Sequence, residues 1–174
     1  MANSHIFRIG AGLVAAAAAC WLATAPAMGE ERETGGRTIL DEAEPDAVLN
    51  ALERAGYEAE ITKAKDGDPK IESTDDDSPF AVNFYDCNDK HEQCAYVQIT
   101  QGWNLKKGLD LAKIDSWNAD NVWGQAYRDD EKDPWLALVI NFKGGVTPEY
   151  VDDMVEWWSV IVDDFEKHIG WDKD

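Results

Sequence analysis

The sequence has little positive charge, few histidines and few cysteines. It holds 16 Lys and Arg residues against 35 Asp and Glu residues, so its formal net charge is −19 over 174 residues. This imbalance argues against binding to nucleic acid or to anionic lipid, because both depend on Lys and Arg beside phosphates. Three histidines and three cysteines leave little material for a metal centre or an activated nucleophile.

Motifs for catalysis and cofactor binding are missing as well. No serine has the surroundings of a nucleophile elbow. Gly144-Gly145 is followed by Val-Thr-Pro, without the lysine of a phosphate-binding loop. Carboxylates are so abundant that pairs of them arise by chance. We therefore expect a protein that is not an enzyme, with no catalytic residues and no cofactor; an unrecognised hydrolase is a distant alternative.

An uncharged run opens the chain. Arg8 precedes the apolar residues Ile9–Ala23, and Ala25-Pro26-Ala27 leads directly into acidic residues. This order is typical of a secretory signal peptide. We predict a signal peptide over residues 1–27 and a periplasmic or secreted mature protein. Cleavage would remove Arg8 and no carboxylate, which changes the net charge from −19 to −20.

Two alternatives to cleavage stay open. Ile9–Met28 is long enough for a retained membrane anchor, although it consists mostly of Ala and Gly and contains Pro26. Cys20 could carry a lipid, although the residues before it are all alanine. The predicted cleavage after Ala27 leaves no stable membrane insertion.

The mature chain has the length of one domain with its own core. Residues 28–40 are polar and contain Gly35-Gly36, which indicates a flexible leader. The domain itself is expected over residues 41–170, followed by a short tail, 171–174.

Three helices are predicted. The first begins at Pro45 and ends before Gly56, and the second spans residues 108–121, with three apolar residues turned inward: Leu111, Ile114 and Trp117. The last has Thr147 as its N-cap and Gly170 as its stop. Its apolar residues form one buried stripe: Val151, Met154, Val155, Trp158, Val162, Phe165 and Ile169.

Strand-like runs separated by Asp, Gly and Pro fill the rest of the chain. They lie at residues 57–63, 70–73, 80–85, 95–100, 122–128 and 135–142. Trp135–Ile140 is apolar at successive positions, so we expect a central strand covered on both faces. Hairpins without βαβ units predict an α+β fold with an antiparallel sheet of about six strands and N-terminal, middle and long C-terminal helices.

Cys87 and Cys94 are the cysteines that remain after the predicted cleavage. They lie at the two ends of a hairpin loop, and such a pair in an exported protein indicates a disulfide. His91 lies between them, so a zinc site is the alternative, although no fourth ligand is evident.

Acidic clusters at residues 66–68, 75–77 and 129–133 raise the possibility of calcium binding. None has the alternating ligands and distal Glu of a calcium loop. Each also lies where a turn is needed, and Asp and Gly are turn residues. We therefore predict no metal site, and keep an acidic small-molecule or cation (calcium) binding envelope protein as the alternative function.

Tryptophan is unusually frequent, with eight in the chain. Trp158 belongs to the buried stripe of the last helix, so its neighbour Trp157 points about 100° away. We expect a protein contact surface on that side, rimmed by acidic residues and formed by Tyr150, Trp157, Val160 and Trp171.

Several short segments together resemble the YbjN family, over roughly Ile39–Gly170. They are Ala-Gly-Tyr at 55–57, Asp-Gly-Asp-Pro at 66–69, Phe-x-Val-x-Phe-Tyr-x-Cys at 80–87, Trp117-Asn118, Asp-Pro-x-Leu at 133–136 and Gly-Gly-Val at 144–146. The resemblance implies a bacterial sensory transduction regulator with a fold similar to type III secretion chaperones, which are α+β and commonly dimeric. It implies no catalytic residues.

These observations lead to one functional hypothesis. We expect a non-enzymatic exported domain that binds a protein or peptide partner, or a second copy of itself as a homodimer, in a regulatory or chaperone-like role. Its acidic surface favours basic partners.

Overall fold

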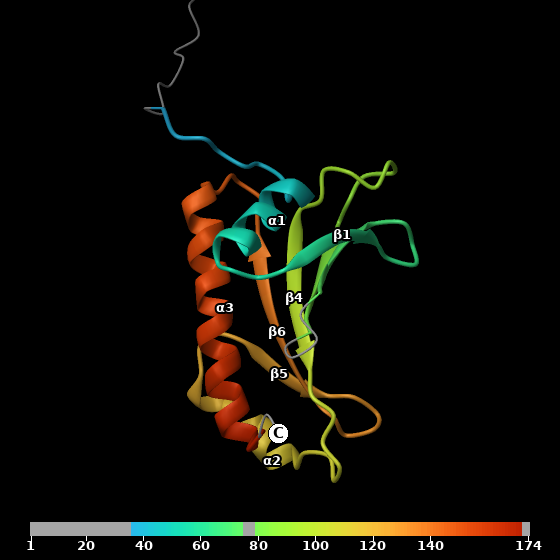
Figure 1. Ribbon diagram of the computed structural model, residues 1–174, viewed down its shortest axis with the longest axis vertical. Coiled ribbons are helices and arrows are strands. Elements are labelled where there is room, and N and C mark those ends of the chain that lie inside the picture. The colour runs from blue at the N-terminus through green and yellow to red at the C-terminus, as the bar shows by residue number, and fades with distance from the viewer. Residues whose placement is uncertain (1–35, 75–78, 172–174) are drawn as a thin grey trace, which may run out of the picture. The chain divides into compact units, whose positions relative to one another are not determined.

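The computed structural model describes residues 36–74 and 79–171. The predicted signal peptide, most of the predicted leader, the acidic residues 75–77 and most of the predicted C-terminal tail lie outside these ranges. Three helices and six strands follow one another in the described chain (Figure 1): α1 (Pro45–Arg54), β1 (Ala59–Lys63), β2 (Pro69–Ser73), β3 (Ala81–Tyr85), β4 (Tyr96–Gly102), α2 (Leu111–Asp120), β5 (Gln125–Arg128), β6 (Pro134–Asn141) and α3 (Pro148–Ile169).

All six strands form one antiparallel sheet, in the order β1-β2-β3-β4-β6-β5. The α+β prediction is therefore confirmed. One row of paired residues crosses five strands, and its members share the face that the helices cover: Ile61, Ile71, Val82, Ile99 and Leu138. Side chains alternate between the faces of a strand, so this register places the other residues of each strand on the opposite face.

The last helix, α3, begins and ends as predicted. The backbone N–H of Tyr150 donates to the Thr147 side chain, Pro148 opens the helix, and Gly170 ends it in the left-handed conformation at φ 74°. Every member of the predicted stripe is buried, and Ile161 and Glu166 are buried as well. Figure 1 shows α3 running along one side of the sheet, with α1 beside its N-terminal half.

The middle helix, α2, is shorter than predicted, and one of its expected core residues is exposed. Ile114 and Trp117 are buried, and the Trp117 ring meets Phe165 of α3 edge-on at 4.9 Å between centroids. Leu111 is 53% exposed, so the prediction that it points inward is wrong. The helix begins only at Leu111, and this first residue lies on the side away from α3.

The apolar strand β6 corrects a second expectation. It is second from the edge, and α3 packs on one of its faces, which carries Leu136, Leu138 and Ile140. On the other face Val139 is exposed. No described helix lies over that side of the sheet in Figure 1. The strand is therefore covered on one face, and its second row of apolar side chains belongs to an open surface.

The outer edge of β5 is closed by a side chain of α2. Asn118 accepts a hydrogen bond from the backbone N–H of Ala126 at 2.8 Å and donates one to its carbonyl at 3.0 Å. An amide group thus pairs with this strand as a neighbouring strand would. Exposed strand edges invite pairing with other chains, and such a cover prevents it.

A disulfide joins Cys87 and Cys94 across the loop between β3 and β4, as predicted. The bond leaves no thiolate for zinc, so the zinc alternative is wrong. Among the described residues, no helix combines the length and the apolar character that crossing a bilayer requires.

Candidate partner-binding surface

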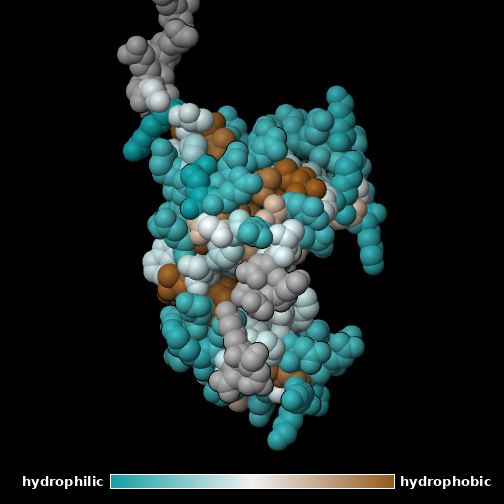
Figure 2. All heavy atoms as spheres, in the orientation of Figure 1, coloured by the Kyte–Doolittle hydropathy of each residue, from teal (hydrophilic) through white to brown (hydrophobic). Residues whose placement is uncertain are grey.

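The outer side of α3 carries three exposed apolar residues. Tyr150, Trp157 and Val160 are 39%, 41% and 48% exposed. On an α-helix, residues seven positions apart point about 20° apart and residues three positions apart about 60° apart, so Tyr150, Trp157 and Val160 form one stripe. We call it the α3 stripe. Figure 2 shows a hydrophobic patch along the edge that α3 forms, among hydrophilic residues.

Adjacent tryptophans on α3 have opposite environments. Trp158 is 1% exposed and lies in the core, whereas Trp157 faces solvent. The sequence periodicity predicts this difference, because consecutive residues of a helix point about 100° apart. An exposed tryptophan ring keeps a large apolar area in water, which contact with a partner would remove.

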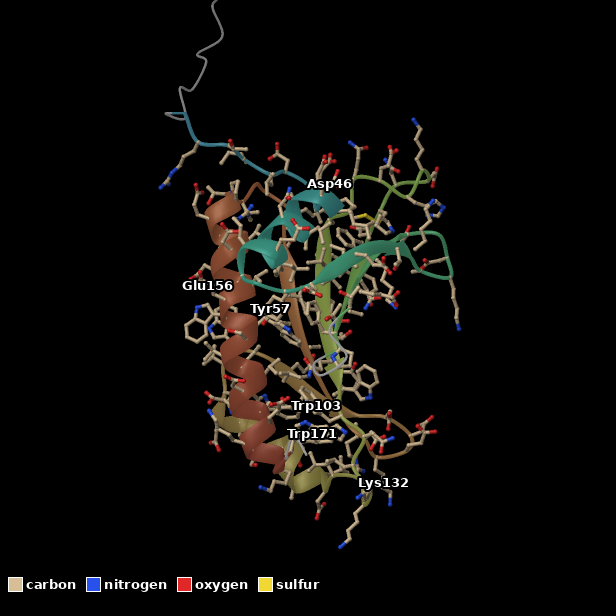
Figure 3. The ribbon with its side chains drawn as sticks, in the orientation of Figure 1. Asp46, Tyr57, Trp103, Lys132, Glu156 and Trp171 are labelled. Carbon is tan, nitrogen blue, oxygen red and sulfur yellow. A yellow bond between two sulfur atoms is a disulfide. The ribbon has the colours of Figure 1, made fainter. Side chains whose placement is uncertain are left out.

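Carboxylates border the α3 stripe. Asp153, Glu156 and Asp164 are exposed on the same helix, and Glu156 points away from the sheet in Figure 3. Asp164 forms an ion pair with Lys167 at 3.0 Å. An apolar centre with a polar rim is the usual composition of a protein contact surface. The negative rim favours a partner that brings Lys or Arg.

Trp171, the fourth predicted contact residue, has a different environment. It is half-buried and packs against the hydrophobic core. Its backbone N–H donates to the backbone carbonyl of Glu166 at 2.9 Å. Figure 3 places it at the C-terminal end of α3, away from Glu156. The structure therefore groups Tyr150, Trp157 and Val160, and leaves Trp171 outside the α3 stripe.

Trp123 is an exposed residue beside α3 that the sequence pattern did not reveal. It lies in the loop between α2 and β5. The next residue, Gly124, has φ +78°, and a Cβ there would lie 3.0 Å from the Ile161 side chain. This close approach fixes the loop against α3. Loop residues follow no periodic pattern, so Gly124 was the one sequence feature that could have indicated this contact with Ile161.

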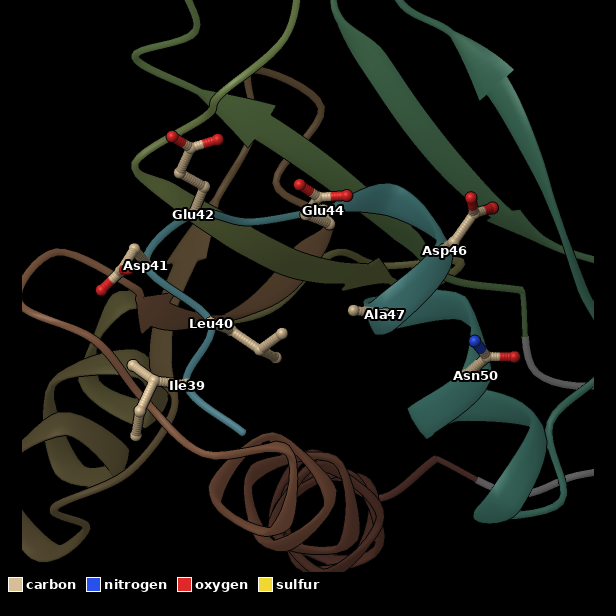
Figure 4. Close-up of a pocket in the computed structure, with 8 residues that line it drawn as sticks. All are labelled: Ile39, Leu40, Asp41, Glu42, Glu44, Asp46, Ala47 and Asn50. Carbon is tan, nitrogen blue, oxygen red and sulfur yellow. The ribbon is translucent and has the colours of Figure 1, made fainter. Parts of the chain in front are cut away.

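An acidic groove lies where the chain enters α1. Its open volume is about 520 Å³, and Figure 4 shows its lining: Ile39, Leu40, Asp41, Glu42, Glu44, Asp46, Ala47 and Asn50. Leu40 is held there by pairing with Val146. The Glu42 carboxylate accepts a hydrogen bond from the Gln93 side chain at 2.8 Å. Asp46 lies in the first turn of α1, where a negative charge favours the helix dipole.

The acidic turn between β5 and β6 brings three carboxylates together, those of Asp129, Glu131 and Asp133. Asp129 accepts hydrogen bonds from the Trp135 indole and from the backbone N–H groups of Glu131 and Asp133. These bonds, that of Trp135 foremost, lower the pKa of the Asp129 carboxyl. The Asp129 carboxylate thus holds the turn, as turn residues do.

The second described acidic turn is tied to the disulfide loop. Asp68 lies 2.7 Å from the His91 ring, and Asp66 accepts from the backbone N–H of Asp68. A Cβ on Gly67 would lie 3.0 Å from the same ring. His91 therefore packs on this turn.

The other described histidine, His168, lies 3.4 Å from the Ser116 hydroxyl. Its Nε2 also lies 2.8 Å from the carbonyl of Lys113, to which Ser116 donates as well. A carbonyl can only accept, so Nε2 carries a hydrogen and cannot take the proton of the serine. The pair joins α2 to α3, and the geometry does not fit the activation of a nucleophile.

Comparison with known families identifies the family of this chain. The model of the YbjN family, described as "Putative bacterial sensory transduction regulator", matches residues 44–171. The matched range contains every helix and strand of the domain. A comparison with curated proteins gives no match.

Proposed function

The chain belongs to the YbjN family, and on that premise we propose that it is an exported regulatory domain that binds a protein or peptide partner through the α3 stripe. The family description fits a non-enzymatic role. The α3 stripe is the observation that carries the proposal, because a protein with a net charge of −19 exposes Trp157 and Val160 side by side.

Export is supported by two features. The N-terminal residues follow the order of a secretory signal peptide. The disulfide between Cys87 and Cys94 is a bond that persists in oxidising compartments. We propose the periplasm as the location, with a secreted protein as the variant of the same proposal.

The test measures how strongly the purified protein captures a partner from envelope proteins. It compares two matched substitutions. Trp157→Ser removes the centre of the α3 stripe, and Val122→Ser removes an exposed apolar residue from the loop that leads to β5. We expect Trp157→Ser to weaken capture of the partner at least tenfold and to leave the melting temperature nearly unchanged. Val122→Ser should leave both unchanged.

Two results would contradict the proposal. A large fall in melting temperature for Trp157→Ser would show that the residue is structural. Capture that survives the substitution would move the contact elsewhere. Sedimentation of the purified protein adds the remaining outcome: a dimer that Trp157→Ser dissociates would identify the partner as a second copy.

Clustered carboxylates support a second candidate, binding of a cation such as calcium. Among the described residues, Asp129, Glu131 and Asp133 in the turn between β5 and β6 offer carboxylate oxygens within 4.8 Å of one another. Calorimetric titration with calcium separates the candidates. Heat at micromolar to millimolar calcium, lost in Glu131→Gln, would favour the turn; no heat at millimolar calcium would remove calcium from the proposal.

A further inference from the structure

The uncovered face of the sheet has no charged residue on four of its six strands. On β3, β4, β6 and β5 its side chains are Ala81, Asn83, Tyr85, Tyr96, Gln98, Thr100, Gly102, Trp135, Ala137, Val139, Asn141, Gln125 and Tyr127. We call this set the open face. Charged residues make up 29% of the chain, so a surface this large without one is distinctive. Its composition combines aromatic, amide and hydroxyl groups.

Two aromatic pairs lie on the open face. Tyr85 and Tyr96 stack with ring centroids 5.3 Å apart, and Tyr127 and Trp135 stack at 6.3 Å. Tyr85 and Tyr127 are exposed. Burial raises the pKa of the Tyr127 hydroxyl, and electrostatic interaction with Tyr85 and Asp129 adds to this effect. Like any tyrosine hydroxyl at neutral pH, it carries its proton and can both donate and accept hydrogen bonds.

Amide and hydroxyl side chains occupy the centre between the aromatic pairs. Asn83 and Gln98 pair directly across β3 and β4, and the Tyr85 hydroxyl lies 3.4 Å from Gln98 Oε1. Both amides are only partly buried. Each offers a donor and an acceptor, which suits a ligand whose own groups do both.

A groove of about 400 Å³ runs across one end of this face, from Glu60 and Glu72 to Trp135. The Trp135 ring lies directly over Gly102, where a Cβ would come within 2.6 Å of it. The indole N–H is fixed by Asp129 at 3.0 Å. Glu72 is paired with Lys70, so its charge is largely balanced. Figure 2 shows an indentation on the side of the domain opposite α3.

The size of the face argues against a second copy as its occupant. The four strands of the open face, about 4.8 Å apart and roughly five residues long, give about 300 Å² of flat area. Even about twice that area, to allow for the relief of the side chains, stays below the roughly 800 Å² of accessible surface that a stable interface buries on each partner. A small, extended ligand fits the face better than another sheet does.

The chemistry of the face narrows the ligand further. A peptide strand would bind at a sheet edge, where backbone groups are unpaired, rather than on the open face, and the edge that borders this face is the β5 edge that Asn118 closes. An anionic ligand would meet the repulsion of a strongly acidic protein. Sugar rings stack their C–H faces on aromatic rings, and their hydroxyls pair with amides. We propose that the open face binds a neutral oligosaccharide.

The test uses the purified protein and neutral linear hexasaccharides: β-1,4-linked glucose, α-1,4-linked glucose and β-1,4-linked N-acetylglucosamine. Tryptophan fluorescence and calorimetry follow the titration. We expect one of them to bind below millimolar concentration. Tyr127→Ser and Gln98→Ala should each weaken that binding by about fivefold or more, since an aromatic contact contributes at this level. Trp157→Ser, on the α3 stripe, should leave it unchanged.

Three outcomes would overturn the proposal. The first is no binding of any of the three at 5 mM. The second is an affinity for the neutral hexasaccharide that neither Tyr127→Ser nor Gln98→Ala changes, or that an anionic galacturonate hexasaccharide matches. The third is a dimer that Tyr127→Ser dissociates. If the Tyr127→Ser variant does not fold, the oligosaccharide affinity of Gln98→Ala serves as the test. Because Trp157 lies outside the open face, partner binding by Trp157→Ser tests the α3 stripe separately.

Discussion

The α3 stripe and the open face are both exposed and aromatic, but their surroundings differ. Trp157 lies among carboxylates on a helix, whereas Tyr127 and Tyr85 lie among amides and hydroxyls on a sheet. Exposed area alone would assign both surfaces the same role. The neighbouring groups separate them, because a charged rim selects an oppositely charged protein and an uncharged polar surface selects a neutral ligand.

The largest expected effect is the loss of stability caused by a substitution on the buried side of α3. Trp158→Ala should lower the free energy of unfolding by about 3–5 kcal/mol, because it leaves a cavity in the core. Trp157→Ala should lower it by less than about 1 kcal/mol. Urea denaturation of the two variants measures the difference. Equal losses would mean that Trp157 is part of the core and that the α3 stripe is no docking surface.

The next effect concerns the disulfide, which joins β3 and β4 beside the stacked Tyr85 and Tyr96. Replacing Cys87 and Cys94 with Ser should cost about 2–3 kcal/mol on the loop-entropy model. The loss should be local: backbone amide exchange should rise around the Tyr85–Tyr96 pair while α3 stays protected. Uniform exchange across both surfaces would show that the bond stabilises the whole domain.

Asn118→Ala tests the edge beside the open face. The substitution leaves the backbone N–H and carbonyl of Ala126 without their partner, which should cost about 1–2 kcal/mol. It also exposes an edge strand, so light scattering should rise on storage. Asn104→Ala, at an exposed loop residue, is the matched control. A variant whose stability and light scattering both match those of the unsubstituted protein would show that water replaces the amide at no cost.

The smallest effect is the response to salt. Raising sodium chloride from low concentration to about 0.5 M shortens the screening distance severalfold. Partner binding at the carboxylate-rimmed α3 stripe should weaken by about fivefold, and oligosaccharide binding at the open face should change by less than about twofold. Equal salt dependence at the two surfaces would remove the distinction between them.

Local sequence patterns predicted much of the domain. Thr147, Pro148 and Gly170 fix the ends of α3 through a cap, a restricted φ and a left-handed residue. The 3.6-residue period separated Trp158 from Trp157. Leu111 escaped this reasoning, because it is the first residue of α2, where helical spacing alone does not tell whether a side chain reaches the packed neighbours. The position of Trp171 could not be predicted in this way, because the chain leaves α3 at Gly170 and no longer follows helical periodicity.

By itself, the sequence determined the class of the fold, the disulfide and the helix that carries Trp157, because caps, turn residues and periodicity act over a few neighbours. Only the tertiary structure decided which face of β6 is covered, that Asn118 closes the edge of β5, and that the uncharged side chains of β3, β4, β6 and β5 form one surface. Alternation along a strand separates two faces, but contacts between residues far apart in the chain decide which face the helices bury.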